Sequence, residues 1–493
     1  MDISSIMKSI LYFLSGEEGS LKRKTVRSIS WVAITGIVTN ILLLVRGVIL
    51  ARILTPEVFG LMSICLVVIR GFEVFTETGF YTALIQRKED YNDAKDTAFT
   101  LMVIRGVILT IITILISPLV AIYYEERILE ITLKVIALSF IFDGFINVNT
   151  VCLQRELNFK RLSYLEQTQS LFNFVIVIIL AYFFKSLWAL VLGHVIAGFT
   201  GCILSYVIVP GRLRFRINDI IAKQLFTYGI FITGLSIVVF ITTEINNIII
   251  GKILGMEALG YYVLAYTLAN LPATHISKVI SRVIFPAYSA LQDNRIALRE
   301  LFQKTLTLIS YITIPAAAGL AVLAPEIVRL VYGDKWTPAA NSLVILSMFG
   351  CIRALGSIQG YLYNAIGKPR ITFYMNAAKL IMILVIIYPL TRKYGLEGAS
   401  LAITIPITIQ YVVELFILRI VIDLSIRKIV NILIVTASYS GIMCLVILFV
   451  KENMRTVNVI DLISLIILGV AVYLFLSRNE LSENIRIMKS SIG

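Results

Sequence analysis

The amino-acid sequence predicts an all-helical integral membrane protein with about 14 transmembrane helices. Of its 493 residues, 58% are hydrophobic and 15% are charged, and the mean hydropathy is +0.89. This composition is too apolar for a water-soluble fold of that length. Apolar runs of about 20 residues recur along the chain, and each can cross a hydrocarbon core of about 30 Å as a helix. One sequence phrase also occurs twice, which indicates two homologous halves.

The predicted spans follow one another closely, because no connecting segment exceeds about 20 residues. We expect them at residues 28–51, 60–84, 97–123, 129–153, 168–184, 187–209, 225–250, 259–285, 301–323, 339–366, 371–390, 396–420, 430–450 and 457–476. Alternate connecting segments, counted from the N-terminus, hold roughly 26 Lys and Arg against roughly 10 in the opposite set. Since basic residues near span ends stay on the cytoplasmic side, both termini are predicted to be cytoplasmic, which requires an even number of spans.

The repeated phrase reads R-I-L-x-x-E-x-x-G from Arg52 and K-I-L-x-x-E-x-x-G from Lys252. In each copy it joins two predicted spans, so spans one to six match spans seven to twelve. An even number of spans in each copy gives a parallel repeat, with its pseudo-twofold axis along the membrane normal. The expected organisation is an N-terminal segment 1–27, a six-helix bundle 28–209, a linker 210–224, a second bundle 225–420, helices 13 and 14 within 421–477, and a cytoplasmic tail 478–493.

Several functional classes are disfavoured by the sequence. It holds no Walker motif, no catalytic constellation and no loop long enough for a nucleotide-binding domain, so we expect neither an enzyme nor ATP-driven transport. The five cysteines lie in apolar runs without CxxC spacing, so no metal is expected, and no cofactor either. The net charge of +14 is spread over short loops, where the positive-inside bias explains it without nucleic acid.

Ionisable residues within spans are costly in lipid, so they normally face a bundle interior or a wet cavity. Span two carries Arg70, Glu73 and Glu77 on one helical face. Span eight carries a basic set at the same spacing: His275, Lys278 and Arg282. Buried pairing between helices is the simpler interpretation for any one residue. Two equivalent stripes with a net positive balance favour a cavity that attracts an anion.

Further charged residues fall within other spans, namely Arg46, Arg105, Asp143, Glu244, Arg353 and Lys379. Arg46 could instead snorkel to the membrane surface, and we expect Glu414 to face headgroups and His194 to be a packing residue. The candidate substrate-binding residues are Arg46, Arg70, His275, Lys278, Arg282 and Arg353. The candidate ion-coupling carboxylates are Glu73, Glu77, Asp143 and Glu244, since a desolvated carboxyl group can take up a proton.

Three stretches of this chain resemble a known group. They are A-R-I-L-T-P-E-V-F-G-L from Ala51, T-G-F from Thr78 followed by A-L-I-Q from Ala83, and L-Q-R-E-L-N-F from Leu153. They resemble polysaccharide exporters of the Wzx type, in the branch that includes colanic acid and teichuronic acid exporters. These belong to the multidrug/oligosaccharidyl-lipid/polysaccharide (MOP) superfamily, whose fold resembles that of the multidrug and toxin extruders (MATE). The resemblance covers nearly the entire chain.

The resemblance implies a flippase in the bacterial inner membrane that moves undecaprenyl-diphosphate-linked oligosaccharide repeat units to the outer leaflet by alternating access. Its implied partners are that lipid-linked glycan, membrane lipid, and the polymerase and glycosyltransferases of the same pathway. A lipid II flippase and a MATE-type multidrug antiporter share the architecture and stay open as alternatives. A scaffolding membrane protein without transport activity is the alternative from another class, and it predicts that charge substitutions in spans two and eight affect folding only.

Overall fold

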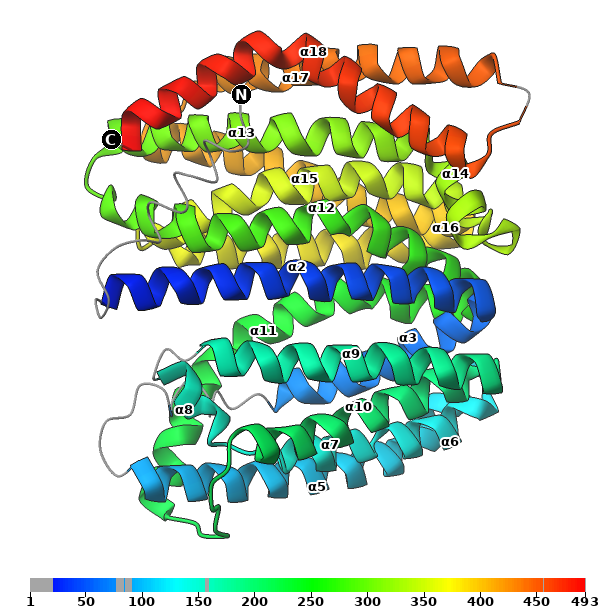
Figure 1. Ribbon diagram of the computed structural model, residues 1–493, viewed down its shortest axis with the longest axis vertical. Helices are drawn as coiled ribbons and strands as arrows, with labels where there is room; N and C mark the ends of the chain where they lie inside the picture. The colour runs from blue at the N-terminus through cyan, green and yellow to red at the C-terminus, as the bar shows by residue number, and fades with distance from the viewer. Residues whose placement is uncertain (1–20, 77–83, 85–90, 156–158, 455, 493) are drawn as a thin grey trace. The chain divides into compact units, whose positions relative to one another are not determined.

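The computed structural model describes residues 21–76, 84, 91–155, 159–454 and 456–492, which form helices and short turns without any strand (Figure 1). Ten helices within these residues are long and apolar enough to cross a membrane. One of them, α16 (Pro369–Ile422), contains both predicted spans eleven and twelve. Helices α2 (Leu21–Ile53) and α12 (Gly255–Ala290) coincide with the first and eighth predicted spans. The all-helical membrane fold expected from the sequence is therefore confirmed.

The contacts between backbone positions divide the chain into two compact units. The first comprises Met1–Leu54 and Ile64–Ile237, and the second comprises Thr55–Ser63 and Val238–Gly493. The start of α3 (Pro56–Phe75) therefore packs with the second unit, although most of that helix belongs to the first. The bundle boundaries at 28–209 and 225–420 stay predictions.

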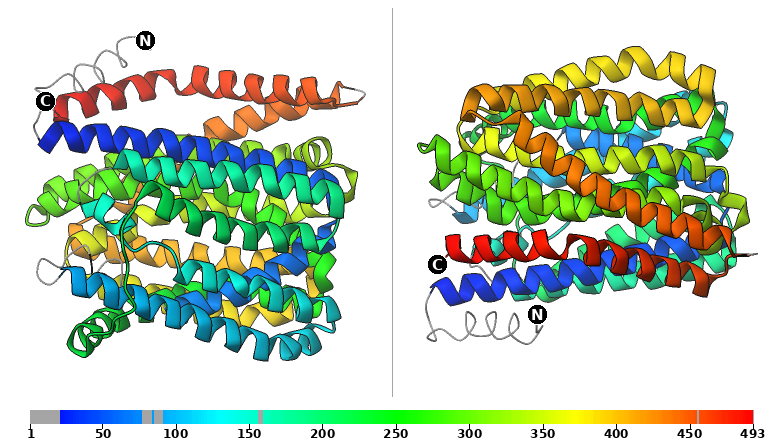
Figure 2. Two further views of the ribbon diagram at one scale, coloured as in Figure 1. Left: turned by 60° about the horizontal axis from the view of Figure 1, so that its bottom comes forward. Right: turned by 90° about the horizontal axis from the view of Figure 1, so that it is seen from above.

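The first unit is built around pairs of long neighbouring helices. Helix α2 lies along α9 (Phe159–Phe184), as both views in Figure 2 show, and α9 packs against α10 (Leu187–Ile208). Helix α5 (Tyr91–Tyr124) packs against α6 (Arg127–Ile136) and α7 (Leu138–Gly144). Gly106 of α5 lies so close to α7 that a Cβ there would be 2.3 Å from the carbonyl oxygen of Phe140. These close crossings are typical of helices that associate in lipid through small residues.

The fourth predicted span, 129–153, is wrong as a single helix. It is divided into α6, α7 and α8 (Thr150–Arg155), with a non-helical segment before α8. Asn147 provides the reason, since its Oδ1 accepts a hydrogen bond from the Asn149 amide at 3.0 Å, and its Nδ2 donates to the Val209 carbonyl at 2.5 Å. Asparagine side chains that bond to nearby backbone groups offer the chain an alternative to the helical ladder.

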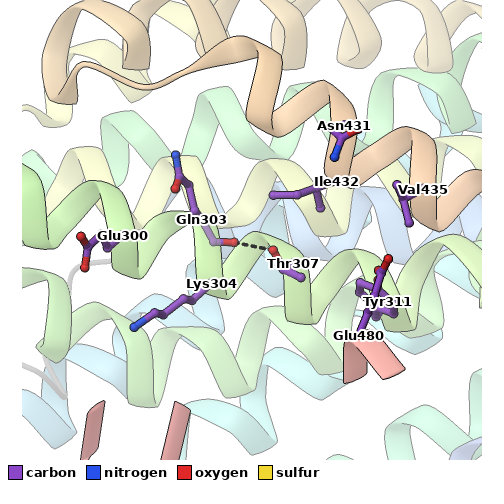
Figure 3. Close-up of a pocket in the computed structure, with 9 residues that line it drawn as sticks. All are labelled: Glu300, Gln303, Lys304, Thr307, Tyr311, Asn431, Ile432, Val435 and Glu480. Atoms are coloured by element: carbon purple, nitrogen blue, oxygen red, sulfur yellow. Dashed lines mark hydrogen bonds between the residues drawn. The ribbon is translucent and has the colours of Figure 1, made fainter. Parts of the chain in front are cut away.

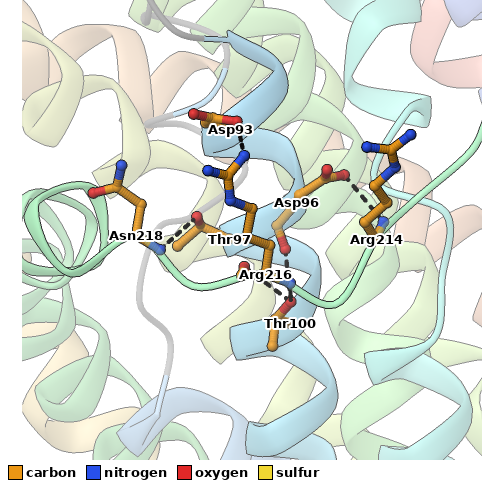
Figure 4. Close-up of polar contacts among 7 residues, drawn as sticks. All are labelled: Asp93, Asp96, Thr97, Thr100, Arg214, Arg216 and Asn218. Carbon is orange, nitrogen blue, oxygen red and sulfur yellow. Dashed lines mark hydrogen bonds and ion pairs between the residues drawn. The ribbon is translucent and has the colours of Figure 1, made fainter.

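The extended segment 209–218, which joins α10 to α11 (Asp219–Ile253), is fixed along the first turns of α5 (Figure 4). Three of its backbone amides donate to side chains of α5: Arg214 to Asp96 at 3.2 Å, Arg216 to Thr100 at 3.0 Å, and Asn218 to Thr97 at 3.2 Å. The Arg216 guanidinium also forms an ion pair with Asp93 at 3.1 Å. Three hydrogen bonds from backbone amides and one ion pair therefore hold this connecting segment to α5.

The second unit has its core where α12, α13 (Arg295–Val322), α15 (Ala339–Ala365) and α16 pack together. Helices α17 (Ile426–Glu452) and α18 (Val459–Ile492) lie beside α13 (Figure 1). The Lys451–Glu326 ion pair, 2.7 Å long, ties the end of α17 to the short α14 (Ala324–Ile327). On α18, Glu480 accepts hydrogen bonds from the hydroxyl groups of Tyr311 and Tyr439. Helices α17 and α18 are thus each bonded to another helix of the second unit.

The turn between predicted spans eleven and twelve lies at Gly395, where φ is 59° and ψ is −137°. Only glycine adopts that backbone conformation without strain. A Cβ at Gly398 would be 2.0 Å from the Leu390 carbonyl oxygen, so the chain folds tightly back on itself here. This geometry agrees with two predicted spans joined by a very short loop.

The two copies of the repeated phrase meet each other within the second unit. A Cβ on Gly60 would be 1.8 Å from the carbonyl oxygen of Met256, and a Cβ on Gly260 would be 1.9 Å from that of Pro56. Each glycine therefore rests on the first-turn backbone of the other copy, which only a residue without a side chain permits. Trp336 is fully buried beside this crossing, with its ring centroid 5.0 Å from that of Phe59. The glycine in the repeated phrase is thus explained by a reciprocal close contact between helices.

Candidate functional site

Charged and titratable residues from five helices gather inside the first unit. Arg105 of α5 donates to the Thr76 hydroxyl at 2.9 Å and to the Glu73 carbonyl at 3.0 Å, so it holds the end of α3. Asp143 of α7 has Glu73 and Arg105 as its electrostatic neighbours. His194 of α10 has Arg70 and Arg46 as its own. The structure therefore brings Arg105 together with five other residues from helices far apart in the sequence: Arg46, Arg70, Glu73, Asp143 and His194. Of these, His194 had been expected only to pack.

The two predicted basic residues of this group differ in their surroundings. Arg70 is exposed on α3 and has at least one polar partner. Arg46 of α2 is half-buried and donates a hydrogen bond to the Asn173 side chain of α9. A second polar link between the same helices joins Gln167 to the Thr39 hydroxyl at 2.7 Å. Arg46 is therefore engaged within the helix pair rather than extended alone toward the membrane surface.

Some predicted site residues lie outside the described part of the molecule. Glu77 is one of them. The backbone of α12 continues through the basic stripe, but the side chains of His275, Lys278 and Arg282 are also outside the description. Their place in a cavity stays a prediction.

The second unit contains a cavity of about 200 Å³ that opens between α11, α12, α15 and α16. Its polar lining comes from Thr242, Thr243, Asn246, Tyr266, Arg353, Asn376 and Lys379. Its apolar walls come from Val239, Phe349, Ile383, Ile403 and Ile407. A concave site with apolar walls and a few convergent polar groups is typical of a ligand-binding site.

Among the described residues, the two cations of this cavity, Arg353 and Lys379, have no carboxylate in direct contact. Within the described residues, the Arg353 guanidinium makes no hydrogen bond or ion pair. Lys379 Nζ donates to Asn376 Oδ1 at 2.9 Å, and Asn376 Nδ2 in turn donates to the Thr372 carbonyl at 2.8 Å. This chain fixes the ammonium group with neutral partners. Both cations are therefore free to donate charge-assisted hydrogen bonds to an anion in the cavity.

Two buried carboxylates accompany the cavity. Glu414 of α16 is only 5% exposed, accepts a hydrogen bond from Gln410 at 2.8 Å, and is an electrostatic neighbour of Lys379. The expectation that Glu414 faces headgroups is therefore wrong, because its helix turns it into the core of the unit. Glu244 of α11 is also 5% exposed and accepts a hydrogen bond from Asn247 at 2.7 Å. Glu244 lies near Tyr262 and Tyr266, whose rings stack at 5.9 Å.

Sequence reasoning missed the neutral half of the lining. Thr242, Thr243 and Asn246 on α11, and Asn376 on α16, are polar residues in otherwise apolar spans. Their uncharged side chains gave a weaker signal than a lone Arg or Lys, since the cost of burying them in lipid is smaller. The i, i+3 spacing of Asn376 and Lys379 is the feature that could have placed both on one helical face.

The fold is that of a multi-span, all-helical membrane protein. Two solved structures share it. "Lipid II flippase MurJ, inward closed conformation" has a TM-score of 0.75 at 18% identity, covering 93% of this chain and 100% of that one. An inward-facing MATE family transporter of the MOP superfamily has a TM-score of 0.65 at 15% identity, covering 80% and 98%. At these identities the likeness shows the fold alone.

Sequence comparison then gives the family. The model of the family described as "Polysaccharide biosynthesis protein" matches residues 49–341. An "Uncharacterized membrane protein in cps region" of Klebsiella pneumoniae is 31% identical, over 78% of this chain and 79% of its own. "Lipopolysaccharide biosynthesis protein WzxC" of Escherichia coli is 29% identical, over 73% and 74% respectively. The chain belongs to the polysaccharide biosynthesis protein family, as the resemblance indicated.

Proposed function

We propose that this protein is a flippase that moves undecaprenyl-diphosphate-linked oligosaccharide repeat units from the cytoplasmic to the outer leaflet of the bacterial inner membrane. The observation that supports this most directly is the pair of cations, Arg353 and Lys379, in a cavity of a chain of this family. A diphosphate offers several oxygens to a guanidinium and an ammonium group. In a cavity screened from water, those bonds are stronger than at the surface.

The proposed cycle is alternating access. The glycan-diphosphate headgroup enters from the cytoplasmic side, and the polyprenyl tail stays in lipid. Arg353 and Lys379 would hold the diphosphate in the second unit, and Arg70 would contact the headgroup in the first. Lys278, Arg282 and His275 on α12 would extend the cationic surface. Both termini are proposed to be cytoplasmic, and the polymerase and glycosyltransferases of the pathway are the proposed functional partners.

Ion coupling is a separate part of the proposal. Glu244 is buried beside Tyr262 and Tyr266, and Asp143 lies near Glu73. Buried carboxylates can bind a coupling ion in one conformation and release it in another. We propose that these carboxylates, together with Glu77, bind the proton or sodium ion that drives the cycle.

A cavity for organic cations should carry net negative charge, so Arg353 and Lys379 favour a lipid-linked anion over a multidrug substrate. They do not separate a polysaccharide precursor from lipid II, since both carry a diphosphate. Deletion of the gene distinguishes these two, because a lipid II flippase without a substitute is required for viability. A viable deletion strain that accumulates a lipid-linked glycan in the inner leaflet supports the polysaccharide substrate.

The decisive experiment replaces the two cavity cations. Arg353→Gln and Lys379→Gln should each lower surface polysaccharide by about tenfold or more, because each removes a charge-assisted hydrogen bond. Lys393→Gln is the matched control, since Lys393 is exposed on α16 and stacks over Tyr394 at 5.0 Å. With membrane levels of all three variants equal, wild-type export by both cavity variants would remove the cavity from the mechanism.

A further inference from the structure

A second cavity, of about 450 Å³, lies in the second unit between α13, α17 and α18 (Figure 3). Its lining on α13 consists of Glu300, Gln303, Lys304, Thr307 and Tyr311, which recur at helical spacing along one face. These residues extend over about 16 Å of helix. The volume is within the range of about 300 to 1,000 Å³ usual for small-ligand sites. We call this cavity the α13 groove.

The polar groups at the mouth of the α13 groove have no side-chain partner among the described residues. Glu300 is exposed, and Lys304 is half-buried one turn further along α13. In the described part of the chain, neither these two side chains nor those of Gln303 and Asn431 make a hydrogen bond or ion pair. In Figure 3, Glu300, Gln303 and Lys304 lie near one end of the groove, away from Tyr311. Donors and acceptors of both charge signs are therefore available to a ligand here.

The deep end of the α13 groove is acidic and buried. Tyr311 is 6% exposed, and its hydroxyl donates to the Glu480 carboxylate, which also accepts from Tyr439 at 3.2 Å. A carboxylate can accept about four hydrogen bonds, so Glu480 keeps acceptor capacity for a ligand. The charged lining comprises Glu300 and Lys304 at the mouth and Glu480 at the deep end. A carboxylate beside a single ammonium group disfavours a diphosphate and favours a zwitterion that carries one ammonium group and one phosphate.

The wall of the α13 groove on α17 is apolar, because Ile432 and Val435 lie on it (Figure 3). Glu300 is in the second turn of α13, five residues after the helix begins at Arg295, and the charge bias places that end at the cytoplasmic surface. The groove thus combines acidic acceptors, one ammonium donor and an apolar strip at the level of the cytoplasmic headgroups.

We propose that the α13 groove binds a phospholipid whose headgroup carries a primary ammonium group and a phosphodiester, that is, a phosphatidylethanolamine. The ammonium group, with three N–H donors, is held at the mouth of the groove by the Glu300 carboxylate and the amide oxygen of Gln303. Lys304 contacts the phosphodiester, and the acyl chains pass over Ile432 and Val435. A trimethylated ammonium group has no N–H to donate, so phosphatidylcholine binds poorly. The lipid here is distinct from the transported one, so the site does not depend on the cations of the other cavity.

The test measures lipid binding to the full-length protein in detergent. Dioleoyl phosphatidylethanolamine is titrated in parallel with the phosphatidylcholine and phosphatidylglycerol of the same chains, and bound lipid is counted by native mass spectrometry. The expected result is binding of phosphatidylethanolamine at least about tenfold tighter than of either other lipid. Glu300→Gln should remove most of this preference. Asp293→Asn, an exposed substitution before α13 that changes charge equally, should keep it.

A second variant guards against a result that arises from misfolding. Lys304→Gln leaves both carboxylates in place, so it should weaken the binding of phosphatidylethanolamine but keep the preference for this lipid over phosphatidylcholine. Equal binding of the three lipids, or an unchanged preference in Glu300→Gln, would overturn the proposal. Equally tight binding of soluble phosphoethanolamine would also overturn it, because the headgroup would then suffice without the acyl chains. Displacement of the bound lipid by undecaprenyl phosphate would overturn it as well, because the groove would then belong to the transported lipid. Export by the cavity variants Arg353→Gln and Lys379→Gln is a separate measurement, so the two proposals can fail independently.

Discussion

Replacing either glycine of the repeated phrase tests how closely its two copies are held together. Gly60→Ala places a Cβ 1.8 Å from the Met256 carbonyl oxygen, and Gly260→Ala places one 1.9 Å from that of Pro56. Ordinary contact between carbon and oxygen needs about 3.2 Å, so the helices must separate by about 1.4 Å. The obstructing atoms are backbone, and they cannot rotate out of the way.

The expected cost follows from two opposing effects. Overpacking of this kind costs about 1–3 kcal/mol, and a rigid backbone obstacle places it near the upper limit. Alanine gains up to about 1 kcal/mol over glycine in a helix. Each substitution should therefore lower the free energy of unfolding by about 2 kcal/mol. Because both glycines lie at one crossing, the first substitution opens space for the second, and the double variant should lose less than the sum of the two.

Unfolding can be followed in mixed micelles by titration with sodium dodecyl sulfate. In a background in which Trp31 and Trp188 are replaced by Phe, the fluorescence of Trp336 reports on this region, since its side chain is fully buried against Phe59. Gly441→Ala in α17 is the control, because a Cβ there meets nothing within 4 Å. If Gly60→Ala and Gly260→Ala are as stable as the control, or if their effects simply add, the reciprocal contact is refuted.

Three further predictions concern single polar groups. Lys451→Met should cost about 3 kcal/mol of unfolding free energy because it leaves the buried Glu326 carboxylate unpaired. Adding Glu326→Gln should restore part of that free energy. If chemical denaturation shows the double variant to be no more stable than Lys451→Met, the prediction is wrong. Gln359→Met should stabilise the protein by about 1 kcal/mol, since Gln359 is fully buried and its amide has no partner within the described residues; a lower melting temperature would contradict this. Asn147→Ala should cost about 2 kcal/mol through the lost bonds to Asn149 and Val209, and unchanged resistance to proteolysis between α7 and α8 would argue against that role.

The sequence predicted the helical fold well, because hydrophobic length is a direct consequence of bilayer thickness. It failed at the fourth span, where the hydropathy of 129–153 is continuous but Asn147 bonds to the backbone of another helix. Such a bond is tertiary, so no local pattern reveals it.

The candidate site was predicted less completely. Arg353 and Lys379 were found from the cost of charge in lipid, and both line the cavity. Glu414 was placed at the headgroups because it lies near the end of its span, yet Tyr363 donates to its carbonyl at 2.9 Å and the side chain is buried. The depth of a residue along a helix can be read from the sequence, but the direction in which it faces depends on its neighbours.

The attachment of segment 209–218 to α5 determines where the chain can bend. A slack connector would let two compact parts move without deforming any helix, but here the backbone amides of Arg214, Arg216 and Asn218 fix the connector. The division between the units then falls after Ile237, inside the continuous α11 and three residues beyond Gly234, around which a Cβ would find open space. The division also falls inside α3, after Ser63, so any swing of one part against the other must bend continuous helices rather than a loop.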